Sequence, residues 1–291
     1  MRVAVTGAGG MLAHTLLPAL DAGGHQALPL TKHDADVTKL DPLRHALRGF
    51  KPDWVIHLAA FTRVDDCESQ PERAYLVNAT GARNAAIAAL ECGAGLLALS
   101  TDYVFDGTSE RPYREYDATA PRSVYGLSKW AGEQAVREIQ PRHLIVRSSW
   151  LFGAGGTNFI DTILKKAQAG ETLRVVDDQR GAPTFTADLA GGLLALLAAG
   201  QLGTFHCTNR GDCTWYELAA HALVRAGLAT PLARTDSATL ARPARRPAYS
   251  VLDTRWFETV TGSALPPWTD AVDRYLGAPA PDHAARGARA T

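Results

Sequence analysis

Tyr125 and Lys129, a tyrosine and a lysine four residues apart, are the residues best placed for chemistry. On a helix, residues i and i+4 lie on one face. A free tyrosine has a pKa of about 10, and a nearby ammonium lowers it by stabilising the phenolate. Such a phenol can donate a proton to a carbonyl oxygen while hydride reaches the carbon. Thr101 follows a predicted strand, and its hydroxyl could share the negative charge on that oxygen. Together these residues predict carbonyl reduction.

A glycine-rich loop near the start of the chain predicts a nucleotide site. Gly7 and Gly10 stand in the spacing Gly-x-x-Gly-x-x-Ala, after an apolar run and before leucines at helical spacing. Glycines let a backbone approach a pyrophosphate, and the helix N-terminus supplies N–H donors. A plain strand–helix turn can have the same spacing. The place of the loop at the head of an α/β pattern favours the dinucleotide interpretation.

The end of the second predicted strand should select the cofactor. No acidic residue stands where a ribose 2′-hydroxyl would be held, and Lys32 occupies that place. A cation there favours a 2′-phosphate and so NADP(H), although Lys32 also suits an ordinary surface. Asp36 and Val37 follow, and could contact the adenine amino group and ring.

Alternating strands and helices predict an α/β protein with a doubly wound parallel sheet. Apolar runs indicate strands, and helical periodicity indicates helices. We expect strands at residues 26–30, 54–58, 95–100 and 143–148, and helices at residues 40–50, 71–92 and 124–140. Beyond residue 151 we expect helices at residues 158–169, 188–199 and 214–226, with a polar loop at residues 235–247.

These elements divide the chain into a dinucleotide-binding domain and a smaller C-terminal lobe. The domain covers residues 1–150, and segments near residues 182–206 return to it. Residues 151–276 form mainly the substrate-binding lobe. Residues 277–291 are rich in Ala, Pro, Arg and Gly, and we expect a disordered tail there.

Composition excludes several classes of protein. Thirty basic and 30 acidic residues give a formal net charge of zero, which does not suit a general nucleic-acid binder. The start of the chain lacks the apolar region of a signal peptide, and the longest apolar stretch is too short to span a membrane. The four cysteines form no C-x-x-C pair, so they predict reduced thiols and no metal knuckle. We therefore expect a cytoplasmic protein that binds neither membrane nor nucleic acid.

Several motifs resemble those of the extended short-chain dehydrogenase/reductases, and more particularly the dTDP-4-dehydrorhamnose reductase family. The resemblance covers residues 1–276, nearly the whole chain. The motifs that carry it are Thr6-Gly7-x-x-Gly10, His57-Leu58-Ala59-Ala60, Ser100-Thr101-Asp102-Tyr103-Val104-Phe105-Asp106-Gly107, Tyr125-x-x-x-Lys129, Arg147-Ser148-Ser149-Trp150, Gly156-Thr157-Asn158-Phe159 and Asp178-Gln179-x-Gly181-Ala182-Pro183-Thr184. The family reduces the C4 ketone of a dTDP-linked 4-keto-6-deoxyhexose with NADPH or NADH, on a Rossmann fold.

The resemblance implies roles for individual residues. Thr101, Tyr125 and Lys129 would form the catalytic trio. The cofactor would contact Gly7, Gly10, Met11, Leu12, Lys32, Asp36, Val37, Ala59, Ala60, Phe61, Thr62, Ser100, Tyr125 and Lys129. The substrate would contact Thr101, Asp102, Val104, Phe105, Trp150, Asn158 and Arg246.

Some of these residues also suit purely structural roles. Trp150 could be a core residue, or its ring could pack on the methyl region of a deoxysugar. Arg246 could pair with a diphosphate or lie in a solvated loop. Asn158 could be a helix N-cap. The acids at residues 65, 66 and 68 favour a solvated face over a metal site.

Two departures from the family pattern bear on the site and on assembly. Tyr249 stands where the Arg-Pro-x-Asn-Ser segment has asparagine, so contacts to the nucleotide or sugar could differ there. Some bacterial members dimerise through a metal held by glutamates, one of them on the first helix. That helix has no glutamate here, so we expect no metal and a monomer or weak homodimer.

Three other functions remain open. The chain could reduce the C4 ketone of another dTDP-deoxysugar. A non-catalytic regulatory subunit of the same fold is a second possibility, which the presence of both Tyr125 and Lys129 disfavours. A nucleic-acid-binding or redox-sensing module is the third, against which stand the zero net charge and unpaired cysteines.

Overall fold

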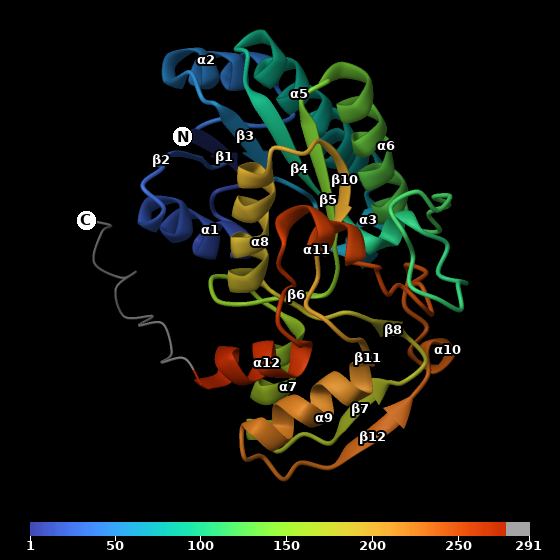
Figure 1. Cartoon of the computed structure of the whole chain (residues 1–291). Coiled ribbons are helices and arrows are strands. Elements are labelled where there is room, and N and C mark those ends of the chain that lie inside the picture. Colours follow the sequence, from blue (N-terminus) through green and yellow to red (C-terminus); the bar gives the residue numbers. More distant parts are fainter. Residues whose placement is uncertain (278–291) are drawn as a thin grey trace, which may run out of the picture.

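The structure, a computed structural model, describes residues 1–277, so all but the first residue of the expected tail lies outside the described part. Within it, six parallel strands form one sheet (Figure 1). In spatial order they are β10 (Gly203–His206), β5 (His143–Ser148), β4 (Gly95–Thr101), β3 (Trp54–His57), β1 (Arg2–Thr6) and β2 (Gln26–Leu30). The predicted parallel α/β sheet is confirmed.

Helices cover both faces of the sheet, because successive strand residues point to opposite sides. Val3 and Val5 pack in one apolar layer, and Ala4 packs in the other. The first layer is closed by α1 (Met11–Ala22), α8 (Thr186–Ala199) and α11 (Arg255–Thr261). The second is closed by α2 (Leu40–Phe50), α5 (Gly81–Glu91) and α6 (Val124–Ile139).

The helix expected at residues 71–92 is interrupted. It consists of α4 (Pro71–Tyr75), the π-helical turn η1 (Leu76–Thr80) and α5. The short helix α3 (Val64–Ser69) precedes it, and the 3-10 turn η2 (Asp102–Val104) follows β4. A π-turn widens the helix locally and is frequent at functional sites.

A second lobe lies beyond the carboxyl ends of the strands (Figure 1). Its helices are α7 (Phe159–Gln168), α9 (Trp215–Arg225), α10 (Ser237–Leu240) and α12 (Trp268–Gly277). Its short strands pair as β6 (Leu151–Phe152) with β9 (Thr184–Phe185), β7 (Leu173–Val176) with β12 (Leu232–Thr235), and β8 (Arg180–Gly181) with β11 (Cys213–Thr214). The expected loop at residues 235–247 therefore contains a helix.

Candidate active site

Thr101 and Tyr125 meet at the carboxyl edge of the sheet, where their hydroxyl groups lie within hydrogen-bond reach. We call the place formed by these two residues the catalytic edge. Thr101 ends β4, and Tyr125 lies in the first turn of α6, which Ser123 caps by accepting a hydrogen bond from the Gly126 N–H at 3.2 Å. A Cβ at Gly126 would stand 2.3 Å from the carbonyl oxygen of Tyr103. Glycine thus lets the start of α6 press against the turn that follows Thr101.

Lys129 does not lower the pKa of Tyr125 in this structure, which corrects the expectation from the sequence. Burial raises the pKa of Tyr125, and the Thr101 hydroxyl opposes that rise. The Lys129 ammonium instead donates a hydrogen bond to the carbonyl oxygen of Leu99 at 2.7 Å. Burial lowers the pKa of Lys129 to about 8. The phenol is therefore protonated at neutral pH, as a proton donor must be.

Asp102 is a buried carboxyl beside Thr101. The Thr101 hydroxyl donates to Asp102 Oδ1 at 3.0 Å. Among the described residues, Asp102 Oδ2 and Ser250 Oγ are buried without a hydrogen-bond partner. Burial raises the pKa of Asp102 to about 6. The Ser250 hydroxyl lies close enough to this carboxyl to oppose the rise of its pKa.

Three neighbours of this pair face the protein interior, which corrects their predicted roles. The Ser100 hydroxyl donates to Glu133 Oε1 on α6 at 2.5 Å, so it does not point toward a cofactor. Val104 and Phe105 are 0% and 1% exposed. The Phe105 ring stacks on Tyr113 at a centroid distance of 4.3 Å. The side chains of Val104 and Phe105 pack in an apolar cluster with Tyr113 and Leu252 and present no surface to a substrate.

Asn78, in the π-turn, holds the loop predicted to contact the cofactor, and the sequence analysis missed it. Its side-chain oxygen accepts from the Phe61 N–H at 2.7 Å, and its amide donates to the Phe61 carbonyl at 3.1 Å. The same amide donates to Ser128 on α6 at 2.9 Å. Ala59, Ala60 and Thr62 lie on this loop with partial or full exposure, whereas the Phe61 ring is buried. Asn78 therefore joins the loop to the catalytic helix.

The glycine loop has the shape that a pyrophosphate site requires. Gly7 has φ +71°, and a Cβ there would stand 2.6 Å from the Ala59 backbone nitrogen. Gly10 precedes α1 with extended backbone, and no side chain caps the helix. The backbone of Met11 and Leu12 forms the open first turn, while the Leu12 side chain packs in the core. A phosphate group fits this bare helix N-terminus.

The loop after β2 uses its acids to make turns. Asp34 accepts from the Thr31 hydroxyl at 2.6 Å, and Asp36 accepts from the Thr38 N–H at 3.0 Å. Lys32 is exposed beside them. Val37 is 7% exposed and packs under Gly81. Lys32 is thus the predicted cofactor residue whose charge remains available on this loop.

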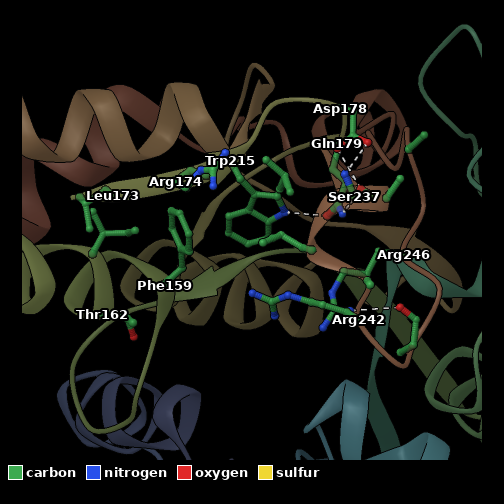
Figure 2. A pocket seen from close by; sticks show the side chains of 18 of the residues that line it. Phe159, Thr162, Leu173, Arg174, Asp178, Gln179, Trp215, Ser237, Arg242 and Arg246 are labelled. Carbon is green, nitrogen blue, oxygen red and sulfur yellow. Dashed lines mark hydrogen bonds between the residues drawn. The ribbon is translucent and has the colours of Figure 1, made fainter. Parts of the chain in front are cut away.

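A cavity of about 720 Å³ lies in the second lobe (Figure 2). Phe159 and Trp215 form an aromatic wall. Trp215 Nε1 donates to the Gln179 side-chain oxygen at 3.2 Å, and the Gln179 amide donates to Ser237 at 2.8 Å. The cations that line the cavity are Lys166, Arg174, Arg242, Arg245 and Arg246. The cavity therefore suits an anionic ligand that carries a flat ring.

One aromatic pair lies beside Thr101, and another lies beside the cavity. The Tyr103 ring meets Tyr125 edge-on at 5.5 Å. Burial raises the pKa of Tyr103, and the charge of Arg246 opposes the rise, so the two groups are close. Trp150 stacks on Trp215 at 3.6 Å. One face of Trp150 is thus covered by Trp215, a residue that sequence reasoning did not single out.

Asp65 forms an ion pair with Arg246. The acids at residues 65, 66 and 68 were expected to form a solvated face, but two of them bond to other segments. Arg246 donates to both Asp65 oxygens, at 3.0 and 2.8 Å, and the Ala244 N–H donates at 3.2 Å. The hydrogen bond from Arg246 holds the pKa of Asp65 below its usual range. Glu68 accepts from the Val124 N–H at the start of α6 at 2.8 Å. Both acids join α3 to neighbouring segments.

Asn158 is the N-cap of α7, the alternative that the sequence left open. Its oxygen accepts from the Asp161 N–H at 3.0 Å, and its amide donates to Gly153 and Tyr275 at 3.2 and 3.1 Å. These bonds occupy the polar atoms that a substrate contact would need.

Tyr249, which departs from the family pattern, packs with the cluster of Val104 and Phe105 and does not line the cavity.

Residues 1–277 contain no cluster of three side chains of the metal-binding types. None of the helices within them has the length and apolar character needed to cross a membrane.

The chain matches a known family over nearly its full length. The family model described as RmlD substrate binding domain matches residues 1–279. The chain is 47% identical over 260 residues to a dTDP-4-dehydrorhamnose reductase of Streptomyces griseus, covering 87% of this chain and 86% of the relative. It is 40% identical over 270 residues to a dTDP-4-keto-6-deoxy-D-glucose reductase of Streptomyces niveus, covering 92% and 94%.

A solved structure is similar in fold as well. The dTDP-4-dehydrorhamnose reductase of Bacillus anthracis, in complex with NADP, superimposes with a TM-score of 0.92 at 36% identity. The match covers 94% of this chain and 98% of that one.

Proposed function

Because the chain belongs to the family described as RmlD substrate binding domain, we propose that it reduces the C4 ketone of dTDP-4-dehydro-β-L-rhamnose to dTDP-β-L-rhamnose with NADPH. The observation that carries this proposal is the meeting of Tyr125 and Thr101 at the sheet edge, between a bare helix N-terminus and a cationic cavity. The pair of Tyr125 and Thr101 suits proton donation to a carbonyl. The helix N-terminus suits a dinucleotide, and the cavity suits a nucleotide-linked sugar.

The cofactor site draws on the loops at the ends of β1, β2 and β3. Gly7 and Gly10 leave room for a pyrophosphate at the start of α1. Lys32 would pair with a 2′-phosphate, because Asp34 and Asp36 are committed to turns. We therefore infer NADPH as the preferred cofactor, with NADH as a weaker substitute. When bound, the nicotinamide supplies the hydride.

Tyr125 is the proton donor in this proposal. Its buried phenol is neutral at neutral pH, so it has a proton to give to the carbonyl oxygen. Thr101 lies beside it to hydrogen-bond the same oxygen. Lys129 lies one helical turn away and, with its pKa lowered to about 8, is largely charged at neutral pH. Its ammonium, which donates to the Leu99 carbonyl, would also hydrogen-bond the ribose of the bound cofactor.

The cavity of the second lobe would receive the dTDP part of the substrate. Its arginines suit the diphosphate, since a guanidinium presents a fork of donors to phosphate oxygens. Phe159 and Trp215 offer flat surfaces for the thymine ring. Arg246 would bind phosphate after exchanging its Asp65 partner. Asp102 and Trp150 would contact the sugar between cavity and nicotinamide.

A second candidate is the reduction of another dTDP-linked 4-keto sugar. The similarity to the dTDP-4-keto-6-deoxy-D-glucose reductase of Streptomyces niveus favours it. The same residues would act, and the face of the sugar that meets the nicotinamide would differ.

We further propose that the protein is cytoplasmic and monomeric or weakly dimeric. The thiols of Cys67, Cys207 and Cys213 are buried and unpaired, which agrees with a reducing compartment. Sedimentation across a hundredfold range of protein concentration would test the monomer.

The test is turnover with dTDP-4-dehydro-β-L-rhamnose, followed by the oxidation of NADPH or NADH, with the product identified by NMR. We expect dTDP-β-L-rhamnose and faster turnover with NADPH. The C4 epimer as product would move the protein to another deoxysugar. Absence of turnover despite NADPH binding would overturn the proposal.

A further inference from the structure

The carboxylate of Glu133 is buried near the catalytic edge and accepts four hydrogen bonds. It is 3% exposed. Arg147 donates to its two oxygens at 2.9 and 2.8 Å, and Arg137 donates at 2.9 Å. Ser100 donates at 2.5 Å. Burial opposes ionisation, but Arg147, Ser100 and Arg137 together outweigh it and hold the pKa of Glu133 below its usual range. A charged carboxylate is thus fixed inside the protein.

The spacing on α6 relates this carboxylate to the catalytic side chains. Tyr125, Lys129 and Glu133 follow one another at intervals of four residues, so they share one face of the helix. That face lies against β4, because Lys129 donates to the Leu99 carbonyl and Glu133 accepts from Ser100. Two consecutive residues of β4 are therefore tied to α6 directly before Thr101.

Arg147 extends the same link to the next strand. It stands opposite Ser100 in the pairing of β4 with β5. Its guanidinium also lies 5.0 Å from the centre of the Phe105 ring, in the segment that follows Thr101. The carboxylate thus connects α6 with both strands that carry the catalytic edge.

Stability alone is a weak reason for such an arrangement. Replacing a buried ion pair by apolar residues of similar volume is often neutral or stabilising, because desolvation offsets the attraction. A buried pair does fix geometry, since its hydrogen bonds allow few arrangements. The catalytic trio needs that property, because Thr101 and Tyr125 come from different elements and must reach one oxygen.

We propose that Glu133 is a positioning residue, which through Ser100 and Arg147 fixes Thr101 on β4 relative to Tyr125 and Lys129 on α6. This inference rests on the reductase function proposed above. Glu133 touches neither substrate nor cofactor in it. Its effect is on the geometry of the step, so its loss should lower kcat more than it changes the KM of the sugar nucleotide, which binds in the other lobe.

The main test compares E133Q/R147M with R147M and the unchanged protein. The double variant removes the carboxylate together with its buried partner Arg147. Arg137 keeps its hydrogen bond to Thr204 and is partly exposed, so the urea midpoint should change little. We expect kcat to fall about 10- to 100-fold, with the KM of the sugar nucleotide within about twofold. R147M keeps the link from Ser100 to Glu133 and should keep more of kcat. A folded double variant with full kcat would overturn the proposal.

A smaller change keeps the proposal testable if the double variant does not fold. S100A removes one hydroxyl and leaves the ion pair in place, whereas S100T keeps the hydroxyl. We expect S100A to lose kcat about tenfold and S100T to retain most of it. Equal kcat values for S100A and the unchanged protein would show that the hydrogen bond from Ser100 to Glu133 does not position Thr101, and would overturn the proposal.

Y125F separates this proposal from the function on which it rests. If the unchanged protein turns over and Y125F does not, the reductase function stands, and the Glu133 variants alone decide the positioning role. If the unchanged protein does not turn over the 4-keto sugar, the proposed function fails and the role of Glu133 in it fails too.

Discussion

The catalytic edge of the sheet and the cavity of the second lobe are built in opposite ways. At the edge, polar side chains are buried and joined by short hydrogen bonds, as in the links from Lys129 to Leu99 and from Asn78 to Phe61. In the cavity, the walls come from segments far apart in the sequence, and a cation such as Arg242 has a side chain 55% exposed. The edge suits a reaction that needs fixed atoms, and the cavity suits recognition of a long anion.

The largest effect should come from the edge. Y125F removes the proton donor and keeps the ring that packs on Tyr103, so we expect kcat to fall about 10³-fold. NADPH affinity, measured by fluorescence titration, should change little. T101V is the matched variant at the same oxygen and should show a smaller loss. Full turnover by Y125F would contradict the proposed chemistry.

Acid should weaken the sheet through two buried histidines. Burial lowers the pKa of His57 on β3 and of His206 on β10 to about 3, from 6.5. Below pH 6.5 the unfolded chain binds protons that the folded chain does not, so the free energy of unfolding falls as pH drops. At pH 5 we expect each histidine to cost about 2 kcal/mol.

Urea denaturation at pH 7.5 and pH 5 measures this loss. H57Q and H206Q should each remove part of the pH dependence. The variants separate the histidines from Asp102, whose raised pKa acts in the opposite direction over this range. A pH dependence unchanged in both variants would show that these histidines are not neutral and buried.

In the cavity, R246M should raise the KM of the sugar nucleotide about tenfold and leave kcat nearly unchanged, because a charge-assisted hydrogen bond to phosphate is lost. D65N is the matched control. If Arg246 exchanges Asp65 for phosphate, D65N frees it and KM stays equal or falls. A similar rise of KM in both variants would indicate that the ion pair only shapes the loop.

The smallest effect should appear at the rim of the cofactor site. K32A should raise the KM for NADPH about fivefold and leave the KM for NADH unchanged, since only NADPH carries the 2′-phosphate. Initial rates with both cofactors measure the ratio. An equal change in the KM values for NADPH and NADH would show that Lys32 does not recognise the 2′-phosphate.

The sequence predicted the edge far better than the cavity. Strands buried on both faces are apolar runs, and helices carry their own periodicity, so the parallel sheet was predicted correctly. Tyr125 and Lys129 were visible because one helical face fixes their spacing. The direction of the Ser100 side chain was not visible, since the pairing of β4 with α6 depends on tertiary packing.

The cavity was predicted poorly because contacts over long sequence separations build it. Trp215 gave no signal, since its stacking partner Trp150 lies 65 positions earlier in the chain. Asp65 resembled a surface charge for the same reason, and nothing in the sequence paired it with Arg246, which the sequence analysis placed at the substrate. The π-turn with Asn78 was missed because its residues fit an ordinary helix equally well.

The path of the chain between the two lobes bears on how the protein is made. β5 ends at Ser148, but β10, its neighbour at the sheet edge, begins only at Gly203. α11, at Arg255–Thr261, then packs against α8 and β10. A nascent chain emerging from the ribosome therefore lacks the edge strand and this covering helix until most of the chain has been synthesised. The sheet is therefore completed late, and until then the open edge of β5 needs protection from other chains.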